Sequence, residues 1–174
     1  SADRVFPELL NEPPMDRDRW LALRDRLAAT VRNSCPDHTI IWGAARYQGI
    51  WETRDLPPLA DGNDIVAVHY YTPMGFTHQC ENWDESPIGR LSGLPFPATR
   101  KSPQVTALRK TLIAAKDTAA LATLDTEFEY PWTTERIAAD FADLAAWSKR
   151  TGTPAILNEF GVLDFCVDAQ SRTN

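Results

Sequence analysis

The sequence predicts an α/β protein with a parallel sheet and helices outside it. Short apolar segments rich in β-branched and aromatic residues alternate along the chain with longer segments whose apolar residues recur at helical spacing. This alternation is typical of parallel sheets, whose strands are joined by helical crossovers. The length of 174 residues, with 43% hydrophobic residues, suits one globular domain with a substantial core, and no repeat, low-complexity tract or linker divides it.

Four strands and three helices are predicted. The strands are the apolar segments at residues 5–10, 38–42, 65–71 and 155–157. The helices are the segments with one apolar face at residues 16–32, 104–124 and 133–150. Asp16 is a suitable N-cap for the first helix and Thr133 or Thr134 for the last, because short polar side chains accept from free N–H groups of the first turn. Residues 43–63 and 71–99, rich in Gly, Pro and polar residues, are predicted to be loops.

Composition excludes several classes of partner. The chain has a formal net charge of -6 and no run of Lys or Arg, whereas nucleic acid and anionic lipid are bound by clustered positive charge. No segment reaches the roughly 20 consecutive apolar residues of a membrane helix. The first residues lack the basic and then apolar pattern of a signal peptide. A neutral or cationic partner is expected, and neither a metal nor an organic cofactor is indicated.

The three cysteines are expected to be structural or incidental thiols. Cys35, Cys80 and Cys166 are odd in number and widely spaced, which is typical neither of a disulfide framework nor of a zinc site with paired ligands. Free cysteine behaves mainly as a small buried apolar residue.

Polar side chains follow three of the predicted strands. Asn11 and Glu12 follow the first strand, His69 and Tyr71 end the third, and Glu159 follows the last. In parallel α/β folds ligands gather at the carboxyl ends of the strands, and a pair of carboxylates there can cleave a glycosidic bond by acid and nucleophile or base action. Each residue alone has a plainer explanation, since a glutamate at a strand end often caps the following helix, and Asn11 could be a backbone cap.

Four ordered stretches resemble the signatures of glycoside hydrolase family 5, in particular its bacterial endoglucanases, the cellulases. They are residues 9–13 (LLNEP), 68–73 (VHYYTP), 76–79 (FTHQ) and 158–161 (NEFG). The resemblance runs through nearly the whole chain. It implies hydrolysis of β-1,4-glucan by a retaining double displacement, with Glu12 as general acid/base and Glu159 as nucleophile. Specificity for mannan, or exo action, stays open because relatives share both glutamates.

The resemblance also implies roles for the neighbours of the two glutamates. Asn11 would bond to the sugar 2-hydroxyl, His69 would lie near the acid/base, and the Tyr71 hydroxyl would donate to the nucleophile. Hydrogen bonds to the ionised form keep a carboxylate charged, whereas an apolar or anionic neighbourhood favours the proton. Glu159 is therefore expected to be charged and Glu12 protonated.

Several aromatic residues are candidates for binding sugar rings. Trp42, Trp51, Trp83 and the loop 76–79 could form subsite walls, because an aromatic ring covers the apolar face of a pyranose. His38, at a strand start and so at the opposite edge of the sheet, is expected to be structural.

The chain is shorter than the roughly 250 residues of a (β/α)8 barrel. If residues 5–10 match the family's fourth strand and 155–157 its seventh, residues 1–174 form a partial catalytic domain of about strands 4–7 of a TIM barrel. An open half-barrel exposes two strand edges and an apolar inner face, so we expect it to self-associate, as a symmetric dimer, or to gain strands from another chain. The alternative function is an inactive half-barrel that binds glucan or is purely structural. Secretion is expected from the resemblance alone.

Overall fold

The structure is a computed structural model, and it describes residues 4–173. Contacts divide the chain into two compact units. The first unit comprises Ser1–Tyr70 with Ala139–Phe160, and the second comprises Tyr71–Ala138 with Gly161–Asn174. No helix in the described part of the chain is long and apolar enough to cross a membrane.

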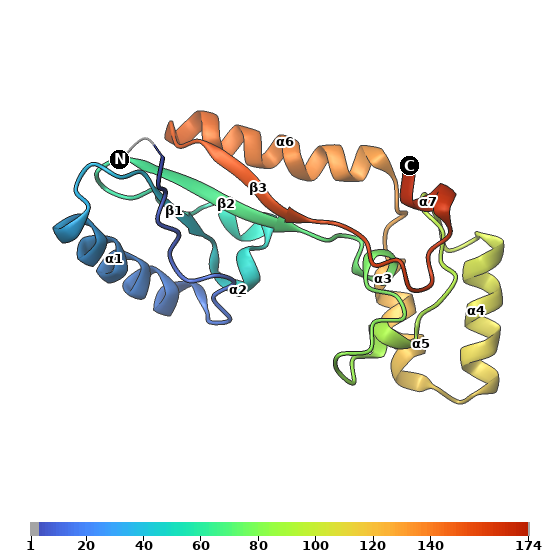
Figure 1. The fold of residues 1–174 in the computed structure, drawn as a ribbon. Helices are drawn as coiled ribbons and strands as arrows, with labels where there is room; N and C mark the ends of the chain where they lie inside the picture. The colour runs from blue at the N-terminus through green and yellow to red at the C-terminus, as the bar shows by residue number, and fades with distance from the viewer. Residues whose placement is uncertain (1–3, 174) are drawn as a thin grey trace. The chain divides into compact units, whose positions relative to one another are not determined.

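The first unit is built on a parallel sheet, as predicted. Its strands are β1 (Ile40–Gly43), β2 (Asp64–Tyr70) and β3 (Ala155–Phe160), in the order β1-β2-β3 (Figure 1). The register pairs Ile40 with Asp64 and Val66 with Ala155, and it shifts after Val68 so that His69 lies opposite Glu159. All three strands therefore end at the same edge of the sheet, where polar side chains from different strands can meet.

The segment predicted as the first strand is reduced to an isolated parallel bridge between Glu8 and Ile41. The Leu9 N–H donates to the Ile41 carbonyl and the Ile41 N–H donates to the Pro7 carbonyl, each over 2.9 Å. Pro7 takes part only as an acceptor, so its missing N–H removes no bond from this ladder. The segment runs parallel to β1, as predicted, but the paired part is much shorter than the predicted strand at residues 5–10.

Helices α1 (Arg17–Ser34) and α6 (Thr134–Thr151) match predicted helices, and the Asp16 carboxylate caps α1 by accepting from the Arg19 N–H. In the first unit α1 lies beside β1 (Figure 1), and α6 contacts the end of β2, where the Tyr70 hydroxyl donates to Asp140 over 2.8 Å. Buried tryptophans hold both helices, since the Trp20 indole N–H donates to the Gly43 carbonyl and that of Trp147 to the Leu56 carbonyl. Between β1 and β2 only short elements occur, α2 (Ala45–Gln48) and the 3-10 turn η1 (Ile50–Thr53).

The second unit is helical. It holds α3 (Met74–Thr77), the 3-10 turn η2 (Pro87–Arg90), α4 (Pro103–Ala114), α5 (Thr118–Glu127) and α7 (Ala169–Thr173). The single helix predicted over residues 104–124 is wrong, because the chain turns between α4 and α5. Lys116 adopts a left-handed conformation with φ 57°, and Asp117 caps α5 by accepting from the Ala120 N–H. The core of this unit joins the loops to the helices through Phe76, Leu91, Leu94, Phe96, Ala98, Val105, Leu108, Leu112, Ala120, Leu124, Phe128 and Trp132.

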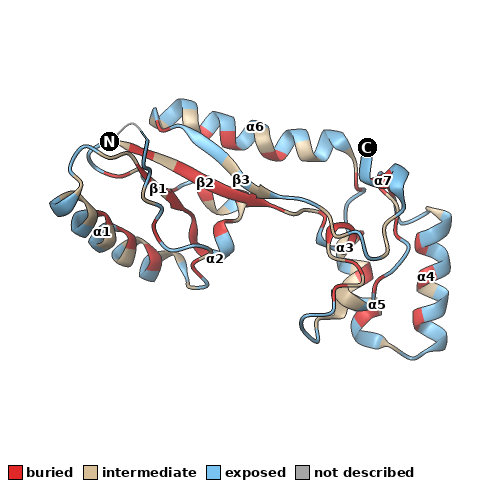
Figure 2. Ribbon diagram, in the orientation of Figure 1, coloured by how far each residue is buried: buried red, intermediate tan, exposed pale blue. Residues whose placement is uncertain are grey.

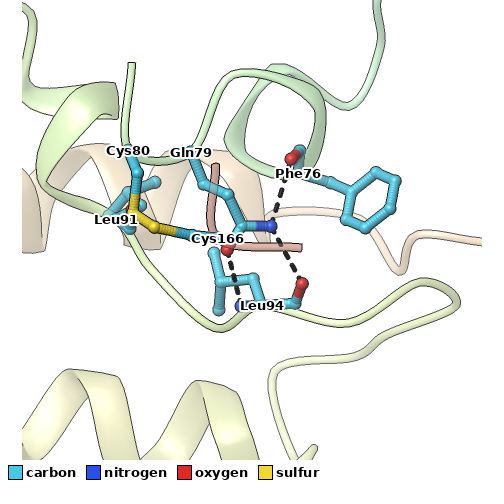
Figure 3. The surroundings of a disulfide bond; sticks show 6 residues. All are labelled: Phe76, Gln79, Cys80, Leu91, Leu94 and Cys166. Atoms are coloured by element: carbon cyan, nitrogen blue, oxygen red, sulfur yellow. Dashed lines mark hydrogen bonds between the residues drawn. A yellow bond between two sulfur atoms is a disulfide. The ribbon is translucent and has the colours of Figure 1, made fainter. Parts of the chain in front are cut away.

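A disulfide in the second unit corrects the prediction of free thiols. Cys80 and Cys166 are bonded across 86 residues of sequence, while Cys35 is free. Beside the bond, the buried Gln79 amide donates to the Phe76 and Leu94 carbonyls and accepts from the Leu94 N–H (Figure 3). Gln79 thus has a structural role in the loop that the sequence marked as a candidate subsite wall.

Burial differs sharply between the strands of the sheet. β2 is buried along almost its whole length, whereas every residue of β3 is exposed or half-buried (Figure 2). Ile156 and Phe160 on β3 are 41% and 69% exposed. β3 is therefore an open edge of an apolar parallel sheet in this chain.

Candidate active site

Three side chains meet at the carboxyl ends of the strands in the first unit. The His69 Nδ1 atom lies 2.8 Å from Glu12 Oε1 and 3.2 Å from Glu159 Oε2. One ligand atom from each of the three residues lies within 4.8 Å of the other two. Glu12, His69 and Glu159, which the sequence predicts at three different strand ends, lie together in the structure.

Local backbone geometry sets the direction of each of these side chains. The shift of register after Val68 sets His69 and Glu159 opposite each other on β2 and β3, so their side chains share one face. Glu12 follows the bridge of Glu8 to Ile41 and adopts a left-handed conformation with φ 47°. This conformation is uncommon for a residue with a side chain and was not predictable from the sequence.

Hydrogen bonding indicates the tautomer of His69. The side chain is buried, and its Nε2 atom has no hydrogen-bond partner among the described residues. A proton on Nε2 would be a buried donor without an acceptor, which is unfavourable. The hydrogen bonding therefore favours a proton on Nδ1, which donates to Glu12 and lies close to Glu159.

The spacing of the carboxylates limits the chemistry of the site. Carboxyl groups about 5 to 5.5 Å apart suit a retaining glycosidase, whereas inverting enzymes need about 6.5 to 9.5 Å to admit a water molecule. Oxygen atoms of Glu12 and Glu159 within 4.8 Å of each other match the shorter spacing. The same three residues could also hold a metal ion, because a histidine nitrogen and two carboxylates are common ligands. Among residues 4–173 they are the only such group.

The remaining predicted residues of the first unit differ in position. Asn11 is exposed beside Glu12, where a sugar hydroxyl could reach it. Trp51 is 47% exposed and its indole N–H donates to Asp140 over 3.1 Å, so one part of its ring is accessible. His38 lies next to the start of β1 and is half-buried, away from the strand ends.

The prediction that Trp42 stacks on sugar is wrong. Its side chain is 0% exposed, and its indole N–H donates to Asp64 Oδ2 over 2.6 Å. The Arg24 guanidinium covers the ring at 4.3 Å from its centroid. With both ring faces and its polar atom packed inside the protein, Trp42 is a core residue and offers no face to a ligand.

Tyr71 and Trp83 belong to the second unit. There the His78 ring makes edge contacts with both, at 5.1 Å from the Tyr71 centroid and 5.7 Å from that of Trp83. Burial lowers the pKa of His78, with the charge of Glu81 opposing the shift, so the imidazole is neutral near pH 7. Trp83 is 58% exposed, so part of its side chain is accessible to a ligand.

A cavity of about 210 Å³ adjoins this aromatic group in the second unit. It is lined by Tyr71, Thr77, His78, Gly161, Val162 and Leu163. The Leu163 N–H donates to the Thr77 carbonyl over 2.9 Å and holds the two loops that form its walls together. The segment after β3 was not predicted to contribute to any site, and only its position directly after Glu159 could have suggested it.

A parallel sheet with two glutamates and a histidine at its carboxyl edge defines a class of α/β proteins with a carboxylate pair suited to glycoside chemistry. Comparison with known proteins gives the family. The model of the cellulase family, glycosyl hydrolase family 5, matches residues 1–173. The chain belongs to this family.

Relatives and solved structures agree with this assignment. Endoglucanase 3 of Fibrobacter succinogenes is 27% identical over 176 residues, which cover 98% of this chain and 26% of that protein. Endoglucanase C of Acetivibrio thermocellus is 27% identical over 96 residues, which cover 55% of this chain and 28% of that protein. The crystal structure of endoglucanase Cel5A from Thermotoga maritima superposes with a TM-score of 0.67 at 28% identity.

The extent of the superposition confirms the predicted partial barrel. The match to the Thermotoga maritima structure covers 98% of this chain but 46% of that chain. The chain thus spans less than half the length of this solved relative and about a quarter of Endoglucanase 3. An α/β fold with a parallel sheet that covers part of a TIM barrel is what the sequence predicted.

Proposed function

We propose that the protein hydrolyses β-1,4-glucan as a retaining endoglucanase, with Glu159 as nucleophile and Glu12 as general acid/base. The observation that carries this proposal is the approach of the two carboxylates to within 4.8 Å, on the strand ends of a family 5 cellulase fold. The names of its relatives, endoglucanases from several bacteria, support the choice of substrate.

The reaction proceeds in two displacements. The Glu159 carboxylate attacks the anomeric carbon while the Glu12 carboxyl gives its proton to the leaving glycosidic oxygen, which produces a covalent glycosyl-enzyme. Glu12, now ionised, then takes a proton from a water molecule, whose oxygen attacks the same carbon and releases Glu159. Because the His69 Nδ1–H occupies Glu12 Oε1, the proton to be delivered sits on the other oxygen of Glu12.

The neighbours of the pair support these steps. Asn11 bonds to the sugar 2-hydroxyl, a contact that strengthens as positive charge develops on the sugar ring. His69 keeps both carboxylates in place by lying between them. Within the second unit, the exposed side chain of Trp83 supports a role in stacking on a sugar ring.

Substitution of each glutamate tests the assignment. Glu159→Gln and Glu12→Gln each keep the size of the side chain and should lower kcat on a soluble β-glucan by about 100-fold or more. Glu129→Gln, on an exposed residue of the second unit, is the matched control and should leave the rate unchanged. A 2-fluoro glycoside should add its glycosyl mass to the unsubstituted protein and not to Glu159→Gln. Unchanged hydrolysis in both glutamine variants would show that the roles are wrong.

The open edge of β3 favours a second feature of the proposal, which concerns assembly. The exposed Ile156 and Phe160 on β3 support pairing of this edge with a strand from a second copy or from another chain. Sedimentation at micromolar concentration should then give a species heavier than one chain. A monomer that unfolds cooperatively would contradict the pairing, and glucan binding without turnover would favour an inactive half-barrel over an enzyme.

We also propose that both units belong to one catalytic domain and that the protein is exported. The Cys80–Cys166 disulfide supports export, because such bonds persist mainly in oxidising compartments. Protein recovered from culture medium should contain one free thiol, that of Cys35, when it is titrated after denaturation. Three titratable thiols in that fraction would contradict an oxidised, exported form.

A further inference from the structure

Gln48 occupies an unusual place beside the candidate active site. Arg46, Tyr47 and Gln48 all adopt left-handed conformations, with φ angles of 50°, 65° and 57°. Each such conformation costs a residue with a side chain about 1 kcal/mol or more, so three in succession persist only where the surroundings hold them. The Gln48 side chain is 0% exposed, although glutamine is mostly found at protein surfaces.

The contacts of Gln48 lead to the backbone of the proposed acid/base. Its Oε1 atom accepts the Glu12 backbone N–H over 2.7 Å, which is a short and direct bond. Glu12 is itself left-handed, and this bond fixes the orientation of its peptide plane. Since the direction of the Glu12 side chain depends on that backbone geometry, Gln48 controls where the carboxylate points.

The sequence provides space for this side chain at Gly43. A Cβ atom on Gly43 would lie 2.0 Å from the Gln48 Cγ and 2.4 Å from its Cδ, so any other residue at position 43 would displace the glutamine. On the other side of Gln48, Gly49 forms a parallel bridge to His69. The turn that carries Gln48 is therefore attached both to Glu12 and to the strand that bears the histidine.

A second set of contacts extends toward the proposed nucleophile. The Gln48 Nε2 atom lies 3.5 Å from Glu8 Oε1, at the long limit of a hydrogen bond, and Asn158 Nδ2 donates to the same oxygen over 3.3 Å. Asn158 directly precedes Glu159 on β3. Glu8 thus accepts from one residue that holds Glu12 and from another that adjoins Glu159.

We propose that Gln48 is a positioning residue for the reaction, which sets the direction of the Glu12 carboxylate through the Glu12 amide and, with Glu8 and Asn158, ties it to the strand end that carries Glu159. The role rests on the proposed function of the two glutamates. Gln48 does not touch substrate in this role, so its removal should impair the chemical step and leave substrate binding largely intact.

Three variants of this chain, with one matched control, separate this role from a merely structural one. Gln48→Met keeps the size of the side chain but offers no acceptor to the Glu12 N–H, and kcat on soluble β-glucan should fall about 10- to 100-fold because a small misplacement of a reacting group has effects of that size. KM should change by less than about twofold, as expected when only transition-state interactions are lost. The control Gln104→Met, on an exposed residue of α4, should change neither constant.

The exchange of Gln48 and Glu8 is the most informative variant. Gln48→Glu alone places a second carboxylate beside Glu8 and should be impaired by repulsion between the two charges. Gln48→Glu combined with Glu8→Gln lets position 48 accept from the Glu12 N–H and from the new amide at position 8. The double variant should recover activity to within about threefold of the unsubstituted protein. The Glu12 N–H keeps its acceptor, the bond between positions 48 and 8 is kept with donor and acceptor reversed, and the Asn158 amide can turn its Oδ1 atom toward the new amide.

Amide hydrogen exchange tests the inference even without turnover. The Glu12 N–H should exchange slowly in the unsubstituted protein and at least about tenfold faster in Gln48→Met, since a bonded amide exchanges only when it opens. If the unsubstituted protein does not hydrolyse glucan, the proposed function fails and this exchange rate alone decides the inference. Unchanged exchange at Glu12, or equal losses of kcat in the exchanged double variant and in Gln48→Glu, would overturn it.

Discussion

Replacement of Trp42 by phenylalanine tests the assignment of this residue to the core. In the structure its indole N–H donates over 2.6 Å to Asp64, a carboxylate that is only 3% exposed. The other donor to the same oxygen is the Leu59 N–H at 3.2 Å, and Asp64 Oδ1 has no partner among the described residues. Trp42→Phe removes the shorter of the two bonds from a carboxylate that water barely reaches.

The expected loss of stability follows from these contacts. A hydrogen bond to a charged group contributes about 1.5 to 3 kcal/mol. The smaller ring leaves unfilled space and weakens the contact with the Arg24 guanidinium, which together add about 1 kcal/mol. Trp42→Phe should therefore lower the free energy of unfolding by about 3 kcal/mol, a large share of the roughly 5 to 15 kcal/mol of a typical domain.

Urea unfolding followed by circular dichroism measures this effect. The double variant Trp42→Phe with Asp64→Asn no longer buries an unpaired charge, so it should lose at least about 1 kcal/mol less than the sum of the two single losses. Trp83→Phe, on a ring that is 58% exposed, should change stability by less than about 0.5 kcal/mol. A stability change below about 0.5 kcal/mol for Trp42→Phe, together with a raised KM for glucan, would show that the ring binds substrate and refute the reasoning.

Further predictions concern the second unit and the end of β2. Burial raises the pKa of Glu127, so its ionised form is less stable in the folded protein than in the unfolded one. Glu127→Gln should therefore raise the Tm at pH 7. It should make little difference near pH 3, well below the ordinary glutamate pKa of about 4.3, where the carboxyl is mostly protonated in both states. Joint replacement of Cys80 and Cys166 by alanine should lower the free energy of unfolding by about 4.5 kcal/mol, as loop closure over 86 residues predicts, and a reductant should have the same effect. Asp140→Asn should lower stability by about 1 to 2 kcal/mol in urea unfolding, because the buried carboxylate accepts from the Tyr70 hydroxyl over 2.8 Å.

The parallel sheet and the meeting of the three site residues were predictable because both follow from topology. Strands joined by helical crossovers point the same way, so residues at their carboxyl ends share one edge whatever the details of packing. Glu12, His69 and Glu159 needed no further information to be placed together. The caps Asp16 and Thr133 were predictable for a local reason, since each accepts an N–H group within its own first turn.

Features that depend on three-dimensional packing were not predictable. The apolar stripe of residues 104–124 continues past Lys116, and a periodic pattern does not reveal one left-handed residue. Trp42 was predicted to bind a sugar ring, but its side chain is buried. Strands of a parallel sheet are apolar on both faces, so the sequence does not show which of their aromatic rings is covered by the rest of the protein. Cys80 and Cys166 are 86 residues apart, and spacing in a chain with three cysteines carries no information on pairing.

The direction of β3 restricts the symmetry of any dimer. Every neighbour pair in the sheet runs parallel, with β3 at the edge. A twofold axis that set β3 against its own copy would make that pair antiparallel, which no barrel of this family fold uses. A twofold axis that runs along the strands would instead keep all strands parallel. It would place β3 of each copy beside residues 7–9 of the other copy, which lie at the opposite edge of the sheet. Crosslinks in a dimer should therefore join β3 to residues 7–9 and not β3 to β3.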